Sequence, residues 1–248
     1  MFGNITFSSN QEKLLDKEFI KHFRDCPIPD SEIISNLGLF LNSKNLSRIL
    51  FMDHIYKQIL DVHGSVIEFG CRWGQNTALF SSLRGIYEPF NRQRKIIAFD
   101  TFEGFPSISA KDGNSVLMKK GVDAVTENYF EYLNKLIELQ EQYNPINHIK
   151  KYELIKGNAI VELEKYLDTN PETIVALVYF DFDIYEPTKK CFELIKKRLI
   201  KGSVLVFDEL NDHDSPGETI ALMETIGLNN VRLKRYRYTS RVSYFVIE

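Results

Sequence analysis

The stretch from Leu177 to Tyr185 constrains this chain most, because it is a predicted strand that runs directly into two carboxylates. Side chains on a strand alternate with a period of two, so we expect Asp181 and Asp183 on one face and Phe180 and Phe182 on the other. Two acidic groups are therefore expected to share one side of the chain at the end of a buried strand.

A second acidic end follows one predicted helix later. Residues 202–207 form an apolar strand, and Asp208 and Glu209 come directly after it. Strands joined by a single crossover helix usually pair in parallel, about 4.8 Å apart. Both acidic ends are then expected side by side at the carboxyl edge of the sheet, where the carboxylates repel one another unless a cation lies among them.

The composition fits one soluble globular domain. The chain has 248 residues, 44% of them hydrophobic and 26% charged, and its net charge is −3. We expect neither a nucleic-acid partner, since there is no basic excess, nor a membrane span, since no apolar run approaches ~18 residues. Residues 1–5 lack the pattern of a secretory signal. The cysteines Cys26, Cys71 and Cys191 lack a C-x-x-C spacing and are interpreted as free thiols, with the cytoplasm as the default compartment.

The first part of the chain is predicted to be helical. Ser9 and Glu12 form a capping-box pattern before apolar residues at helical spacing, and Pro27 and Pro29 end that helix. A second helix is expected from about residue 45 to residue 62. We interpret residues 1–64 as an N-terminal helical cap, which either covers the active site, mediates oligomerisation or simply packs on the sheet.

Residues 65–77 are predicted to form a strand, a glycine turn and the start of a helix. Gly70 lets the backbone turn sharply and approach a ligand, and Gly74 brings the chain close to a helix whose amino end favours a carboxylate. The spacing Glu-x-Gly-x-x-x-Gly differs from the G-x-G-x-x-G of dinucleotide folds, and Glu68 would repel a pyrophosphate. Glu68 suits a cationic ligand such as S-adenosylmethionine better; a structural turn is the alternative.

Two further strands end in polar residues with possible cofactor roles. Asp100 follows the strand at 95–99 and is expected to accept hydrogen bonds from ribose hydroxyls, with an ordinary turn acid as the alternative. A short strand at 152–155 leads to Asn158, whose side-chain amide could bond the adenine edge. A simple surface turn is the alternative interpretation of Asn158.

Four motifs taken together resemble the macrocin O-methyltransferase family of metal-dependent class I methyltransferases. They are Glu68-x-Gly70-x-x-x-Gly74, the run from Asp100 to Pro106, the run from Asp181 to Thr188, and Asp208-Glu209. The resemblance covers roughly residue 66 to the C-terminus. It implies methylation of sugar hydroxyls, often on deoxysugars of antibiotics or on nucleotide-linked precursors, with S-adenosylmethionine and a magnesium ion.

The resemblance and the motifs define the expected site. The expected cofactor-binding residues are Glu68, Gly70, Arg72, Gly74, Asp100 and Asn158, although Arg72 stands where many methyltransferases have a glycine. The expected ligands of Mg²⁺ or a similar divalent cation are Asp181, Asp208 and Glu209, the last standing where the family has a second aspartate. The expected catalytic base is Asp183, which would deprotonate a cation-bound alcohol before the oxygen attacks the sulfonium methyl group.

We therefore predict an α/β, Rossmann-like class I methyltransferase domain over residues 65–248, with a mostly parallel, doubly wound sheet and an antiparallel last strand. An insertion at about residues 107–150 forms a lid, an oligomer contact or plain packing. The predicted partners are a small sugar substrate and further copies of the chain in a homo-oligomer. The alternative functions are methylation of a catechol or other small diol, and non-catalytic binding of S-adenosylmethionine.

Overall fold

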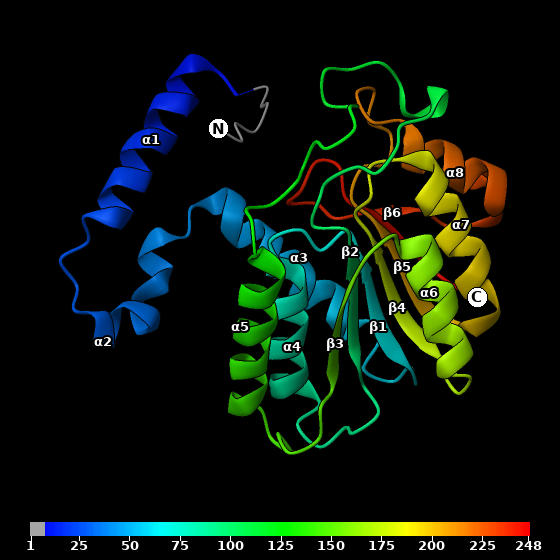
Figure 1. Cartoon of the computed structure of the whole chain (residues 1–248), viewed down its shortest axis with the longest axis horizontal. Helices are drawn as coiled ribbons and strands as arrows, with labels where there is room; N and C mark the ends of the chain where they lie inside the picture. Colours follow the sequence, from blue (N-terminus) through cyan, green and yellow to red (C-terminus); the bar gives the residue numbers. More distant parts are fainter. Residues whose placement is uncertain (1–7) are drawn as a thin grey trace. The chain divides into compact units, whose positions relative to one another are not determined.

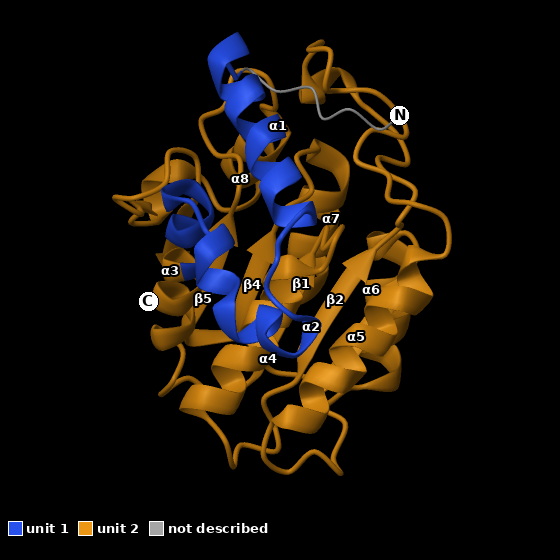
Figure 2. Cartoon of the chain, turned by 90° about the vertical axis from the view of Figure 1, so that its left-hand side faces the viewer, with its two compact units in different colours: residues 1–49 blue, residues 50–248 orange. Residues whose placement is uncertain are grey.

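The computed structural model describes residues 8–248, and the chain divides into two compact units, residues 1–49 and residues 50–248 (Figure 2). The boundary between the units falls inside a helix. The functional division at residue 64 stays a prediction. The predicted absence of a secretory signal concerns residues 1–5, which lie outside the described range.

From residue 8 onward the first unit is mainly helical, as predicted. Helix α1 (Asn10–Arg24) begins with the expected capping box, in which the Glu12 N–H donates to Ser9 Oγ and the Ser9 N–H donates to Glu12 Oε2. After α1 come α2 (Asp30–Ile33), the 3₁₀ helix η1 (Ile34–Phe40) and α3 (Ser43–Lys57), whose last turns belong to the second unit.

The second unit is built on a seven-stranded sheet with the order β3-β2-β1-β4-β5-β7-β6 (Figure 1). Strands β1 to β5 pair in parallel, whereas β7 runs antiparallel to both β5 and β6. The predicted mostly parallel sheet with an antiparallel last strand is therefore confirmed. The strands are β1 (Ser65–Phe69), β2 (Ile96–Asp100), β3 (Tyr152–Lys156), β4 (Val175–Phe180), β5 (Leu199–Phe207), β6 (Lys234–Arg235) and β7 (Ser243–Val246).

Helices cover both faces of this sheet (Figure 1). One face packs on α6 (Ala159–Thr169), α7 (Tyr185–Ile195) and α8 (Gly217–Thr225), and the other on α4 (Gln75–Tyr87), α5 (Tyr129–Tyr143) and the end of α3. The period of two explains the split, because Ile67 and Phe69 enter the first core and Val66 the second. Short 3₁₀ helices complete the unit: η2 (Ala110–Asp112), η3 (Lys196–Arg198) and η4 (Leu228–Asn230).

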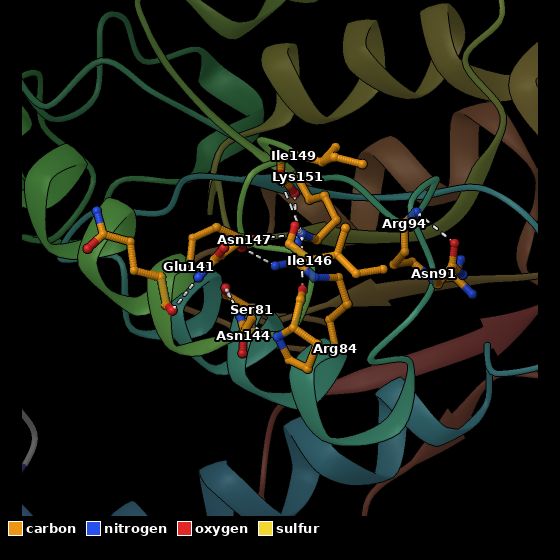
Figure 3. Close-up of polar contacts among 12 residues, drawn as sticks. Ser81, Arg84, Asn91, Arg94, Glu141, Asn144, Ile146, Asn147, Ile149 and Lys151 are labelled. Carbon is orange, nitrogen blue, oxygen red and sulfur yellow. Dashed lines mark hydrogen bonds and ion pairs between the residues drawn. The ribbon is translucent and has the colours of Figure 1, made fainter.

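A buried ionic cluster joins α4, α5 and the start of β3 (Figure 3). Arg84 donates to the backbone oxygen of Lys151 at 2.7 Å and forms an ion pair with Glu141, and Lys151 Nζ lies 2.7 Å from the other Glu141 oxygen. All three side chains are almost fully buried. Removing Glu141 would leave the buried charges of Arg84 and Lys151 without their shared partner, at a cost of about 3–5 kcal/mol. The cluster is therefore a structural anchor at the amino end of β3.

The predicted insertion contains one long helix, α5. Its buried apolar residues are Leu133 and Ile137, whereas Tyr132 and Leu136 are exposed. No helix formed by residues 8–248 combines the length and the apolar character needed to cross a membrane.

Candidate active site

The carboxyl ends of the central strands lie side by side, and backbone hydrogen bonds continue the sheet one residue past each strand. The Asp181 N–H donates to Phe69 O at 2.9 Å, and the Asp208 N–H donates to Phe180 O at 3.0 Å. The turns that follow β1, β4 and β5 therefore start at one edge of the sheet, as expected for parallel strands.

The glycine turn after β1 is shaped by close backbone contact with the end of β4. Gly70 has a φ of 82°, and a Cβ built there would overlap the carbonyl oxygen of Asp181. Gly74 also has a positive φ, of 76°, and precedes α4, where a Cβ would overlap the Leu133 side chain. At Gly70, only glycine combines a positive φ with the close approach of the Asp181 carbonyl oxygen, which explains the first glycine of the motif.

Asp100 links the turns after β1 and β2. Its Oδ2 accepts the Arg72 N–H at 2.7 Å, and its Oδ1 accepts the Phe102 N–H at 2.6 Å. Burial raises the pKa of Asp100, while these two hydrogen bonds oppose that rise. Each carboxylate oxygen can accept more than one hydrogen bond, so this arrangement leaves Asp100 able to receive a ribose hydroxyl.

Arg72 and Glu68, two predicted cofactor contacts, are held by other protein groups. Arg72 has a φ of 46°, and its guanidinium forms a 2.7 Å ion pair with Asp123. Glu68 is fully buried in β1 and accepts a hydrogen bond from the hydroxyl of Thr77 in the first turn of α4. In this structure Glu68 thus ties the strand to the helix across the glycine turn.

Asn158 is exposed and caps α6. Its Oδ1 accepts the Ile160 N–H at 3.0 Å, which satisfies one of the free donors at the helix start. The preceding residue, Gly157, donates its N–H to Asp100 O at 2.9 Å. Asn158 therefore lies beside the turn after β2, with its side-chain oxygen bonded to the helix start.

The expected alternation of Asp181 and Asp183 on one strand face is wrong. Strand β4 ends at Phe180, and Asp183 has a φ of 60°, in the left-handed region that non-glycine residues rarely adopt. The period of two does not apply to such a turn. Asp183 Oδ1 is nevertheless buried and has no hydrogen-bond partner among residues 8–248. Burial and the neighbouring acids Glu209 and Glu218 raise the pKa of Asp183 well above its usual range.

The two acids after β5 have different partners. Asp208 Oδ1 accepts the Tyr179 hydroxyl at 2.5 Å. Glu209 turns towards Arg241 and Ser215, which donate to its Oε2 at 2.6 Å and 2.9 Å. Burial raises the pKa of Glu209 to about 7, against the opposing effect of Arg241.

One residue of this edge has no counterpart in the sequence prediction, namely Glu218 in the first turn of α8. It is fully buried, and its carboxylate accepts backbone N–H groups from the turn after β4 and from the turn after β5, which are called the two acidic turns below. Burial, together with Asp181 and Asp208, raises the pKa of Glu218. Glu218 lies in the first turn of its helix, where acids are usually solvated, so no local sequence signal marked it as buried.

The carboxylates do not form a closed metal cage. Among the described residues, no three His, Cys, Asp or Glu side chains converge closely enough to hold a metal ion. Asp181 and Asp208 follow neighbouring strands, but Glu209 faces Arg241. Mg²⁺ often binds proteins through only one or two carboxylates and keeps several waters, so Asp181 and Asp208 fit such an ion as its protein ligands.

Comparison with solved structures gives a match along nearly the whole chain. The calicheamicin methyltransferase CalS11 is 37% identical, over 97% of this chain and 94% of that chain, with a TM-score of 0.94. The apo structure of CalS11, a TDP-rhamnose 3'-O-methyltransferase in calicheamicin biosynthesis, is 34% identical over 97% of this chain and 96% of that chain, with a TM-score of 0.86.

A more distant match supports the fold alone. The O-methyltransferase NovP is 17% identical over 81% of this chain and 79% of that chain, with a TM-score of 0.60. Comparisons with protein-family models and with curated protein sequences give no match.

Proposed function

Since the chain belongs to the family of S-adenosylmethionine-dependent sugar O-methyltransferases that includes CalS11, we propose that it methylates a sugar hydroxyl of a nucleotide-linked deoxysugar. The observation that carries this proposal is the near-full-length similarity to a TDP-rhamnose 3'-O-methyltransferase, at 37% identity in one of the CalS11 structures and 34% in the other. Acidic turns at the edge of the sheet supply the chemistry that such a reaction needs.

The methyl donor is assigned to the edge formed by β1 and β2. The Gly70 turn brings the backbone close to the ligand, and the Asp100 carboxylate would accept the ribose hydroxyls. Contacts within the protein would hold this turn in shape. Glu68 bonds Thr77, Arg72 pairs with Asp123, and Gly74 precedes α4. Asn158, beside Asp100, would reach the adenine edge with its amide N–H₂ group.

A divalent cation, Mg²⁺ or similar, is assigned to Asp181 and Asp208. The positions of Asp183 and Glu218 support this, because burial raises the pKa of both groups and the neighbouring carboxylates raise it further. When bound, such an ion would lower the pKa of a coordinated sugar hydroxyl. Glu209 would become a third ligand only after its ion pair with Arg241 breaks.

Asp183 is assigned as the general base. Its unpartnered Oδ1 can accept the proton of an acceptor hydroxyl. As the O–H bond breaks, the sugar oxygen attacks the methyl carbon of the donor. The new O–CH₃ bond forms while the S–CH₃ bond breaks, and S-adenosylhomocysteine leaves. Orientation of the two bound substrates would supply much of the acceleration.

The test is methyl transfer from ¹³C-methyl-labelled S-adenosylmethionine with Mg²⁺ present. Separate reactions would contain TDP-rhamnose, other TDP-deoxyhexoses, free rhamnose or a catechol, and Asp183→Asn would serve as the inactive control. We expect a labelled O-methyl signal with at least one nucleotide-linked sugar and none with catechol. Labelling of catechol alone would favour the small-diol alternative. Donor binding by calorimetry without transfer to any acceptor would favour a non-catalytic role.

The partners and location predicted from the sequence are carried forward as proposals. We expect a homo-oligomer in the cytoplasm, and size-exclusion chromatography coupled to light scattering would measure the number of subunits. The insertion at about residues 107–150 would close over the acceptor, contribute to the oligomer contact or simply pack on the domain.

A further inference from the structure

A buried carboxylate from outside the predicted site joins the two acidic turns. Glu218 is fully buried, and among residues 8–248 it forms no ion pair with a basic side chain. Its Oε1 accepts the N–H groups of Phe182 at 3.1 Å and Asp183 at 3.3 Å. Its Oε2 accepts the Glu209 N–H at 3.2 Å. One side chain therefore bridges the turn after β4 and the turn after β5.

Packing alone does not explain a glutamate at this position. A buried carboxylate is costly to desolvate, and Glu218 also lies near Asp181 and Asp208, whose charges repel its own. An apolar side chain would fill the same space without either cost. The three backbone donors offset that cost, so the contribution specific to Glu218 is the geometry that its hydrogen bonds impose on the two turns.

A second buried carboxylate holds the other end of the same turn. Asp112 of η2 is almost fully buried, and its Oδ1 accepts the Tyr185 N–H at 2.5 Å. Its Oδ2 accepts the Ser109 N–H at 2.6 Å, so Asp112 is itself fixed by its own loop. The backbone is therefore fixed at Asp183 and two residues later. The Asp183 N–H donates to Glu218, and the Tyr185 N–H donates to Asp112.

The start of α8 packs directly against this turn. A Cβ built on Gly217 would lie 2.6 Å from both Asp112 Oδ1 and Tyr185 N, and 2.8 Å from Asp183 O. A non-glycine residue with a φ of 60° is in an unfavourable conformation, which persists only where the surrounding structure holds it. Glu218, Asp112 and the close approach at Gly217 are the surroundings that hold Asp183.

We propose that Glu218 is a positioning residue for the methyl transfer, which together with Asp112 holds Asp183 in its left-handed conformation and aligns it with Asp181 and Asp208. This inference rests on the proposed function, in which Asp183 is the base. Glu218 acts through the backbone and has no contact with substrate. Its loss should therefore slow the chemical step without weakening donor binding at β1 and β2.

The test compares Glu218→Gln and Glu218→Ala with Glu141→Gln as a matched control. Glu141 is as deeply buried but lies in the ionic cluster with Arg84 and Lys151. We expect Glu218→Ala to lower kcat about 100-fold, because small displacements of a reacting group have effects of that order. The dissociation constant for S-adenosylmethionine should stay within about twofold, since the donor-binding turns are untouched.

Glu218→Gln should fall between Glu218→Ala and the wild type in kcat. Its amide oxygen can still accept the N–H groups of one turn, but its N–H₂ group cannot accept those of the other. Glu141→Gln should lower the melting temperature and leave kcat unchanged. If Glu218→Ala does not fold, Glu218→Gln and Asp112→Asn carry the test. Wild-type kcat in Glu218→Gln, or a parallel loss of donor affinity, would overturn the proposal.

A crystal structure of Glu218→Gln separates this inference from the proposed function. We expect Asp183 to leave the left-handed region or to become disordered, whether or not any sugar acceptor is methylated. An unchanged turn in that variant would overturn the positioning role even in an active enzyme. An inactive wild type with a shifted turn in the variant would instead overturn the proposed function while leaving the positional coupling intact.

Discussion

The backbone N–H of Asp208 donates a 3.0 Å hydrogen bond to the carbonyl oxygen of Phe180, the last residue of β4. This bond extends the parallel register of β4 and β5 by one residue, so Asp181 and Asp208 directly follow the ends of two neighbouring strands. The carboxylate residues Asp181 and Asp208 therefore lie side by side at the carboxyl edge of the sheet. The proposed cation depends on that relationship.

Asp181→Ala should lower Mg²⁺-dependent turnover by about 100-fold or more, because it removes one of the two carboxylates assigned to the cation. The affinity for S-adenosylmethionine should change little. Steady-state kinetics and calorimetric donor binding would measure the two effects. Asp168→Ala, which removes an exposed acid from α6, is the control and should behave like the wild type. Turnover retained in Asp181→Ala would remove Asp181 from the site.

Gly70→Ala should be far more harmful than Gly121→Ala, although both glycines have nearly the same φ, 82° and 79°. A Cβ on Gly70 overlaps the Asp181 backbone, whereas a Cβ on Gly121 meets no described atom within 4 Å. We expect Gly121→Ala to cost about 1 kcal/mol of unfolding free energy and Gly70→Ala about 3 kcal/mol or more. Urea denaturation would measure both. Equal losses would show that the close approach at Gly70 is unimportant.

Arg241→Ala should cost more stability in the wild type than in a Glu209→Gln background. In that background the carboxylate that Arg241 pairs with is already gone. Glu209 is 8% exposed, so the loss of Arg241 leaves a nearly buried carboxylate with only Ser215. The Arg241 side chain is 51% exposed, and solvent screening limits the coupling to about 1 kcal/mol. A double-mutant cycle by denaturant unfolding measures it. A coupling of zero would mean that the pair contributes nothing to stability.

Acid should weaken the contacts between α7 and α8 through Glu224. Hydrogen bonds from Lys111, Tyr185 and Lys189 lower the pKa of Glu224 from 4.5 to about 2. A lowered folded-state pKa contributes stability above pH 4.5, and that contribution is lost as the pH falls towards 2. The stability difference between the wild type and Glu224→Gln should therefore shrink across this range.

Denaturant unfolding at several pH values would test this expectation. Glu186→Gln, which removes an exposed carboxyl group from the same helix pair, controls for the loss of a charge alone. A stability difference between Glu224→Gln and the wild type that stays constant from pH 6 to pH 3 would contradict the role of Glu224.

The sheet and its acidic edge could be predicted from the sequence because they depend on local patterns. Apolar runs ending in Asp100, Asp181 and Asp208 marked three strands, and the spacing of Gly70 and Gly74 marked the turn between β1 and α4. Each of these signals lies within a few residues of the element that it predicts. The family resemblance, carried by the same motifs, is confirmed by the similarity to CalS11.

The arrangement within the acidic edge could not be predicted in the same way. The φ of Asp183 depends on Glu218 and Asp112, which lie 35 residues after it and about 70 residues before it in the chain. No local pattern reports such contacts, so extending the alternation of β4 through Asp183 failed. The Glu209 contact with Arg241 spans 32 residues and was missed for the same reason.

The most direct measurement is a crystal structure with Mn²⁺ and S-adenosylhomocysteine, in which anomalous scattering locates the ion independently of turnover. We predict one anomalous peak bonded to a carboxylate oxygen from each of Asp181 and Asp208, beside the sulfur of the bound nucleoside. An ion bonded to neither carboxylate, or an acidic edge that stays empty at saturating Mn²⁺, would contradict a metal-assisted methyl transfer at this site.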